Sequence, residues 1–216
     1  MTNIKENLKE VTAKLPEGVR LVAVSKFHPV EELAQAYEAG QRLFGENRAQ
    51  ELIAKAPLLP KDIRWHFIGH LQKNKVRSIL PVVSCIQSLD SIALAEIIEK
   101  EAARINKTVD VLAEFHLASE DENKTGLNPD EAFAFFDEVM KLEHLNLCGI
   151  MAMGPHTDDE QRVRDVFLQG KKLFDALQER YGKDRITTLS MGMSSDYKTA
   201  LSCGSTMVRI GTYLFE

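Results

Sequence analysis

The feature that most constrains the fold of this chain is a series of eight short apolar runs that alternate with helical patterns. The runs lie at residues 20–24, 41–45, 64–69, 82–86, 110–117, 147–153, 187–192 and 206–211. Their apolar residues are continuous rather than alternating with polar ones, which is typical of parallel strands covered on both faces. The stretches between them have helical periodicity, and residues 162–182 show it best, with an apolar face of Val163, Val166, Phe167, Gly170, Phe174 and Leu177.

About eight strand–helix units predict an α/β fold, a single (β/α)8 TIM barrel, over residues 1–216. Little sequence follows the last strand, so we expect the amphipathic N-terminal segment, Ile4 to Leu15, to replace the final helix as an extra N-terminal helix. The alternative is an open Rossmann-type sheet, which the absence of G-x-G-x-x-G after the first strand disfavours. The sequence contains no repeat or linker, so we predict one domain.

The composition limits the class of protein. The formal charge of −5 gives no basic surface of the kind that nucleic-acid-binding proteins carry. No apolar run reaches the roughly 20 residues that a membrane span needs. Cys85, Cys148 and Cys203 lie far apart in apolar contexts and fit small buried side chains better than a metal or disulfide pattern. We therefore expect a cytoplasmic protein, monomeric because one complete barrel buries its own core.

The residue of most chemical interest is Lys26, which directly follows the first strand in "LVAVSKF". In a barrel of this type, functional side chains lie at the carboxyl ends of the strands. Lys26 could simply extend its ammonium group to solvent. The functional interpretation is a Schiff-base lysine, whose neutral form would be favoured by burial among Val22 and Val24 and by a nearby cation.

Small and hydroxylated residues follow the last two predicted strands, where barrels of this type commonly bind phosphate. Glycine lets backbone N–H groups approach an anion, and serine and threonine add hydroxyl donors. The residues are Gly192, Ser194, Ser195, Gly211 and Thr212. A reactive lysine facing a phosphate site across the barrel mouth is an arrangement that holds pyridoxal phosphate.

The sequence resembles the pyridoxal phosphate homeostasis proteins (the YggS/PROSC family) and, more distantly, the barrel domain of alanine racemases. The matching stretches are "LVAVSKFHP", "AGQRLFGENRAQE", "WHFIGHLQKNK", "LCGIMAM", "LSMGMSSDYKTAL" and "CGSTMVRIGTYLF". The resemblance implies that Lys26 holds pyridoxal 5′-phosphate as an internal aldimine, with Asn47 near the cofactor's 3′-oxygen and Arg209 facing its pyridine nitrogen. It implies that the phosphate lies among Ser194, Ser195, Gly211 and Thr212.

The resemblance also implies a role in controlling free pyridoxal phosphate, with pyridoxal-phosphate-dependent apoenzymes as candidate recipients. It places Lys124 near the cofactor as well. The sequence ends at Phe215 and Glu216, with little of the C-terminal tail that some relatives carry.

A carrier with little or no catalysis is the interpretation that Arg209 favours. Arginine offers only donors and cannot stabilise a protonated pyridine, so the ring would be a poor electron sink. One alternative is a small racemase-like enzyme with His66 as its second base. Another is a phosphate-sugar barrel enzyme in which Lys26 reacts with substrate. His66 and His70 lie four residues apart at a strand end, which is not a helical zinc motif, so we predict no metal.

Overall fold

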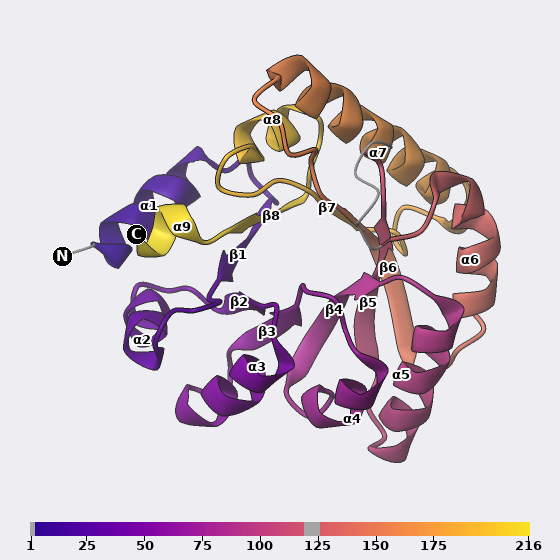
Figure 1. The fold of residues 1–216 in the computed structure, drawn as a ribbon, viewed down its shortest axis with the longest axis horizontal. Coiled ribbons are helices and arrows are strands. Elements are labelled where there is room, and N and C mark those ends of the chain that lie inside the picture. Colours follow the sequence, from indigo (N-terminus) through magenta and orange to yellow (C-terminus); the bar gives the residue numbers. More distant parts are fainter. Residues whose placement is uncertain (1–2, 119–125) are drawn as a thin grey trace.

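The computed structural model describes residues 3–118 and 126–216, in which eight parallel strands form a closed barrel in sequence order (Figure 1). The strands are β1 (Arg20–Val24), β2 (Leu43–Glu46), β3 (Arg64–Phe67), β4 (Val83–Leu89), β5 (Val109–Phe115), β6 (Leu145–Ala152), β7 (Thr188–Ser190) and β8 (Met207–Ile210). β1 pairs with both β2 and β8, which closes the sheet. The predicted (β/α)8 barrel is confirmed, and the open doubly wound sheet was the wrong alternative.

Helices surround the barrel and cover the outer face of its strands (Figure 1). They are α1 (Ile4–Lys14), α2 (Val30–Glu38), α3 (Ala49–Lys55), α4 (Val76–Ile79), α5 (Ile92–Arg104), α6 (Ala132–Val139), α7 (Glu160–Tyr181), α8 (Tyr197–Ser202) and α9 (Thr212–Phe215). Local signals fix several ends. The Ser91 hydroxyl accepts a hydrogen bond from the Leu94 N–H at 3.3 Å to begin α5, and Gly182 ends α7 with a φ of 97°.

The N-terminal helix α1 takes the place of a long final helix, as predicted. It lies beside the four-residue helix α9, which carries the last residues of the chain (Figure 1). The Asn7 amide donates to the Leu214 carbonyl at 3.3 Å, and the Tyr213 hydroxyl donates to Glu10 Oε1 at 2.8 Å. The helix also buries an apolar stripe of Ile4, Leu8 and Val11. The first and last elements therefore complete the helical layer together.

The core has two parts because successive strand residues point to opposite faces of the sheet. Most buried apolar residues form one large cluster between the strands and the helices. It includes every residue of the predicted face of α7 except Gly170, which is also buried. Small clusters fill the barrel interior, one of them formed by Val22, Leu43 and Met207. Among the described residues, none of the helices combines the length and apolar character needed to cross a membrane.

Candidate functional site

The predicted site residues lie at one end of the barrel, because all eight strands run in the same direction. Lys26 lies two residues beyond β1, and Asn47 directly follows β2. β1 lies between β2 and β8, so the segments that carry Lys26, Asn47 and Gly211 leave neighbouring strands. Ser194 and Ser195 follow β7, and Thr212 begins α9 directly after Gly211.

Gly211 joins three of these segments. Its N–H donates to the Ser194 hydroxyl at 3.3 Å, which links the loops after β7 and β8. A Cβ at position 211 would lie only 3.1 Å from the Val24 carbonyl oxygen, so glycine allows this loop to pack against the end of β1. The two predicted phosphate loops therefore contact each other and the strand that leads to Lys26.

The loop after β7 also depends on a glycine. Gly192 has a φ of 94°, in the left-handed region that favours glycine. A Cβ there would lie 2.7 Å from the Ala200 Cβ, so the residue lets α8 pack closely on the loop. The next peptide is fixed by the Asp196 carboxylate, which accepts from the Met193 N–H at 2.6 Å. Ser194 is half-buried and Ser195 is exposed in the loop that results.

Arg209 lies inside the barrel, and its guanidinium group is held by three hydrogen bonds. It donates to the Ser190 carbonyl at 2.9 Å, to the Ser190 hydroxyl at 2.6 Å and to the Ala152 carbonyl at 3.1 Å. Burial lowers the pKa of Arg209 to about 10, while the negative charges of Asp196 and Glu114 act in the opposite direction. The group is therefore protonated at neutral pH and its orientation is fixed.

A chain of hydrogen bonds runs from Arg209 across the barrel interior to His66. The Ser190 hydroxyl, which accepts from Arg209, donates to Gln87 Oε1 at 2.7 Å. The Gln87 amide then donates to His66 Nδ1 at 2.8 Å. Since an amide nitrogen can only donate, Nδ1 is the acceptor and the imidazole is neutral.

His66 is a buried residue, and its surroundings disfavour its interpretation as a second catalytic base. Burial, assisted by the positive charges of Arg20 and Arg64, lowers the pKa of His66 to about 3. The ring lines a cavity of about 70 Å³ together with Arg20, Arg64 and Thr188, which are the first residues of their strands. The cavity therefore lies toward the amino end of the barrel, away from the end that carries Lys26.

The side chain of Lys26 is exposed, so the prediction that Val22 and Val24 bury it is wrong. Both valines are buried in the barrel, but the lysine lies beyond the end of the strand. Within residues 3–118 and 126–216, Lys26 Nζ makes no hydrogen bond or ion pair, and it lies 5.9 Å from the centroid of the Phe27 ring. A molecule bound over the amine, rather than the strand itself, would have to exclude water from it.

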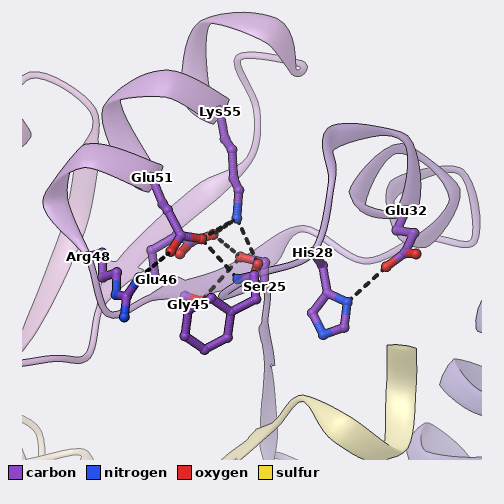
Figure 2. A network of polar contacts seen from close by, with 9 residues as sticks. Ser25, His28, Glu32, Gly45, Glu46, Arg48, Glu51 and Lys55 are labelled. Atoms are coloured by element: carbon purple, nitrogen blue, oxygen red, sulfur yellow. Dashed lines mark hydrogen bonds and ion pairs between the residues drawn. The ribbon is translucent and has the colours of Figure 1, made fainter. Parts of the chain in front are cut away.

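A polar network beside Lys26 was not predicted from the sequence (Figure 2). Lys55 Nζ donates to the Ser25 carbonyl at 2.8 Å, to Glu46 Oε1 at 2.7 Å and to Glu51 Oε2 at 2.9 Å. The Ser25 hydroxyl donates to the same Glu46 oxygen at 2.8 Å. The available signals were the i,i+4 spacing of Glu51 and Lys55 and an acidic residue at the end of an otherwise apolar strand.

The site has unsatisfied groups that a ligand could complete. Asn47 Oδ1, directly after β2, is buried and has no hydrogen-bond partner among the described residues. The Lys26 amine, Asn47 and the two loops joined at Gly211 surround the same barrel end, which fits an aldehyde with an attached anionic group. Lys124 lies outside the described residues. In the described part of the chain, no group of three or more His, Cys, Asp or Glu side chains could hold a metal ion.

The fold and this barrel end define a class of protein: a (β/α)8 barrel with an exposed lysine after its first strand and glycine- and serine-containing loops after its last two. The chain belongs to the family of alanine racemase N-terminal domains, whose sequence model matches residues 1–216. It is 38% identical over 221 residues to a Pasteurella multocida (strain Pm70) protein named pyridoxal phosphate homeostasis protein, covering 100% of this chain and 94% of that protein.

Two solved structures of PipY from Synechococcus elongatus PCC7942 are also similar. The structure without pyridoxal phosphate has a TM-score of 0.94 and 38% identity, covering 99% of this chain and 100% of that one. The structure with pyridoxal phosphate bound has a TM-score of 0.92 and 36% identity, covering 99% and 100%. The predicted resemblance to pyridoxal phosphate homeostasis proteins is confirmed.

Proposed function

We propose that this protein binds pyridoxal 5′-phosphate covalently through Lys26 and acts in pyridoxal phosphate homeostasis as a binding and carrier protein. The observation that carries the proposal is the exposed amine at the end of β1, next to loops that Gly211 links by its contacts with Ser194 and Val24. PipY, which has been solved with pyridoxal phosphate bound, and the names of the relatives support the same function.

Each predicted residue has a defined task in the proposal. The Lys26 amine adds to the aldehyde carbon and water leaves, so the C=N bond forms without an oxidant or reductant. The phosphate is held by the Ser194, Ser195 and Thr212 hydroxyls and by backbone N–H groups near Gly211. Asn47 lies beside the cofactor's 3′-oxygen, where its amide supplies a hydrogen bond. Bound pyridoxal phosphate supplies an electrophilic carbon attached to an electron-withdrawing ring.

Arg209 supports a carrier rather than an enzyme. It faces the pyridine nitrogen in the proposal, and its pKa of about 10 keeps it protonated at neutral pH. A group that only donates cannot accept a hydrogen bond from a pyridinium N–H, so the ring nitrogen that faces it stays unprotonated and withdraws electrons less strongly. The racemase-like alternative loses its candidate second base, because His66 is buried and directed away from this end of the barrel.

We also propose that residues 1–216 form one pyridoxal-phosphate-binding domain, active as a monomer in the cytoplasm and supplying pyridoxal-phosphate-dependent apoenzymes. The closed barrel with α1 and α9 in one helical layer supports a single domain and a monomer. The three free cysteines, Cys85, Cys148 and Cys203, are compatible with a reducing compartment.

Borohydride reduction followed by peptide mass analysis tests the proposal directly. We expect the protein mixed with pyridoxal phosphate to develop a visible absorption band and to retain the reduced label on the peptide that contains Lys26. The Lys26→Ala variant should show neither. A label on another lysine, or no label in the folded wild-type protein, would contradict the assignment. Amino-acid racemase turnover that disappears in Lys26→Ala would favour the enzyme over the carrier.

A further inference from the structure

The segment that carries Lys26 has an unusual backbone conformation. The His28 N–H donates to the Ser25 carbonyl at 3.1 Å, so residues 25–28 form a four-residue turn with Lys26 and Phe27 in the middle. Phe27 has a φ of 67° at the third position, where a type II turn normally requires glycine or asparagine. Phenylalanine in this region is strained, and such strain persists only where the surrounding structure holds it.

Burial of the Phe27 side chain does not hold this turn, because 64% of the residue is exposed. Hydrogen bonds to the peptide groups on both sides of Lys26 do so instead. Lys55 Nζ donates to the Ser25 carbonyl at 2.8 Å, and the Phe27 N–H donates to Glu51 Oε2 at 2.9 Å. The residues before and after the reactive lysine are therefore both anchored to α3.

The anchoring groups are themselves fixed to one another and to the barrel wall (Figure 2). Lys55 Nζ bridges Glu46 Oε1 at 2.7 Å and Glu51 Oε2 at 2.9 Å, and Glu46 is 0% exposed. Strand alternation explains the position of Glu46: Leu43 of β2 packs inside the barrel, so Glu46, three residues later, points outward toward α3. The helix α3 begins two residues after Asn47, directly beyond β2. Through Lys55 and Glu51 it is therefore also hydrogen-bonded to the segment that follows β1.

Stabilisation of the fold does not by itself account for this network, because its charged groups are buried. Burial raises the pKa of Glu46. Burial would also raise the pKa of Glu51, but hydrogen bonds from Lys55 and the Phe27 N–H outweigh it and lower that pKa. The Glu46 and Glu51 carboxylates share the Lys55 ammonium group, and Glu46 Oε2 is buried with no partner in the described part of the chain. Well-packed apolar residues often stabilise a fold as well as or better than a buried ion pair.

We propose that Glu46, Glu51 and Lys55 are positioning residues that hold the strained turn so that Lys26 is presented to the aldehyde of pyridoxal phosphate. The inference rests on the proposed function of Lys26. In the structure these three residues make no hydrogen bond or ion pair with the Lys26 amine, and they act through the peptide groups of Ser25 and Phe27.

Three variants and a matched control test the proposal. Lys55→Met removes the three hydrogen bonds that Lys55 Nζ donates to Ser25, Glu46 and Glu51. Glu51→Ala removes the acceptor of the Phe27 N–H on a side chain that is 21% exposed, so it decides the question if Lys55→Met does not fold. Glu51→Gln keeps a carbonyl oxygen for that N–H and is the rescue variant. The control is Lys107→Met, which removes a half-buried lysine that donates to the Leu80 and Val83 carbonyls at 2.7 and 2.6 Å, far from the site in the fold.

The first readout needs no ligand: hydrogen exchange of the Phe27 amide, followed by NMR. Lys55→Met and Glu51→Ala should speed this exchange by at least about tenfold, because the anchor that protects the amide is lost. Glu51→Gln should recover most of the protection of the Phe27 amide. Lys107→Met should leave this protection at the wild-type value, even if it lowers the melting temperature as much as the test variants do. Unchanged exchange in Glu51→Ala would overturn the anchoring role.

The second readout is the equilibrium constant for the visible band formed with pyridoxal phosphate. Freeing the backbone of about one residue predicts about 5- to 30-fold weaker imine formation in Lys55→Met and Glu51→Ala. Wild-type constants in both variants would overturn the inference while leaving Lys26 as the binding lysine. If the wild-type protein formed no imine at Lys26, the proposed function would fail and the positioning role with it, whatever the exchange at Phe27.

Discussion

His66 should make this protein lose stability in mildly acidic solution. The ring is buried, its Nδ1 accepts from Gln87, and burial, with help from the charges of Arg20 and Arg64, lowers its pKa from 6.5 to about 3. The unfolded chain therefore binds a proton below pH 6.5 that the folded protein does not accept until about pH 3. The stabilising contribution is present above pH 6.5 and is lost progressively as the pH falls toward 3.

The size of the effect follows from proton linkage. Each unit of pH below the unfolded pKa favours the unfolded state by about 1.4 kcal/mol, so the loss at pH 5.0 relative to pH 7.5 is about 2 kcal/mol. This value depends only on a folded pKa well below 5. Glu46 acts with the opposite sign: burial raises its pKa, so its contribution is present at low pH and is lost as the pH rises through that value. Wild-type data alone would therefore mix the two effects.

Urea unfolding of the wild type and His66→Gln, followed by far-UV circular dichroism, separates them. Glutamine does not titrate, and its carbonyl oxygen keeps an acceptor for the Gln87 amide. Between pH 7.5 and 5.0 the wild type should lose about 2 kcal/mol more than the variant, and the contribution of Glu46 cancels. Equal losses in the two proteins would refute a neutral, desolvated His66.

Two further predictions concern the barrel interior. Gln87→Leu leaves the Ser190 hydroxyl without its acceptor and His66 Nδ1 without its donor. The free energy of unfolding should therefore fall by about 1–3 kcal/mol in a urea titration. Pyridoxal phosphate should also bind more weakly, because the partner that orients Ser190 against Arg209 is lost. Unchanged stability and affinity would show that the chain from Arg209 to His66 has no energetic role. Gly149→Ala adds a Cβ 2.7 Å from the Thr188 carbonyl carbon. It should therefore push β6 and β7 apart and lower the unfolding free energy by about 1–3 kcal/mol, and a melting temperature equal to that of the wild type would contradict this close approach.

The fold was predictable from sequence because each strand is buried on both faces and so reads as a continuous apolar run. The errors lie at the ends of two strands. The fourth run was predicted to end at residue 86, but β4 continues to Leu89, because Gln87 points into the barrel and satisfies its amide with Ser190 and His66. The seventh run was predicted to reach residue 192, but the chain leaves β7 after Ser190, and Gly192 has a positive φ.

The candidate site was only partly predictable. The lysine and the loop residues could be found because strand ends in a parallel barrel share one edge. The exposure of Lys26 could not be predicted from the sequence, because it depends on where the turn after β1 directs the chain. The full network around Lys55 could not either. Apart from the i,i+4 partner Glu51, its partners are Ser25, which follows β1, and Glu46 of β2, and no local pattern places these groups beside α3. Tertiary contacts alone bring them behind the reactive lysine.

A crystal structure of the protein soaked in pyridoxal phosphate tests the central claim most directly. The account predicts continuous density from Lys26 Nζ to the cofactor, the phosphate between Ser194 and Gly211, and the pyridine nitrogen facing Arg209. A cofactor bound elsewhere, such as the cavity of about 70 Å³ at the opposite end of the barrel, with Lys26 still extended into solvent, would contradict it.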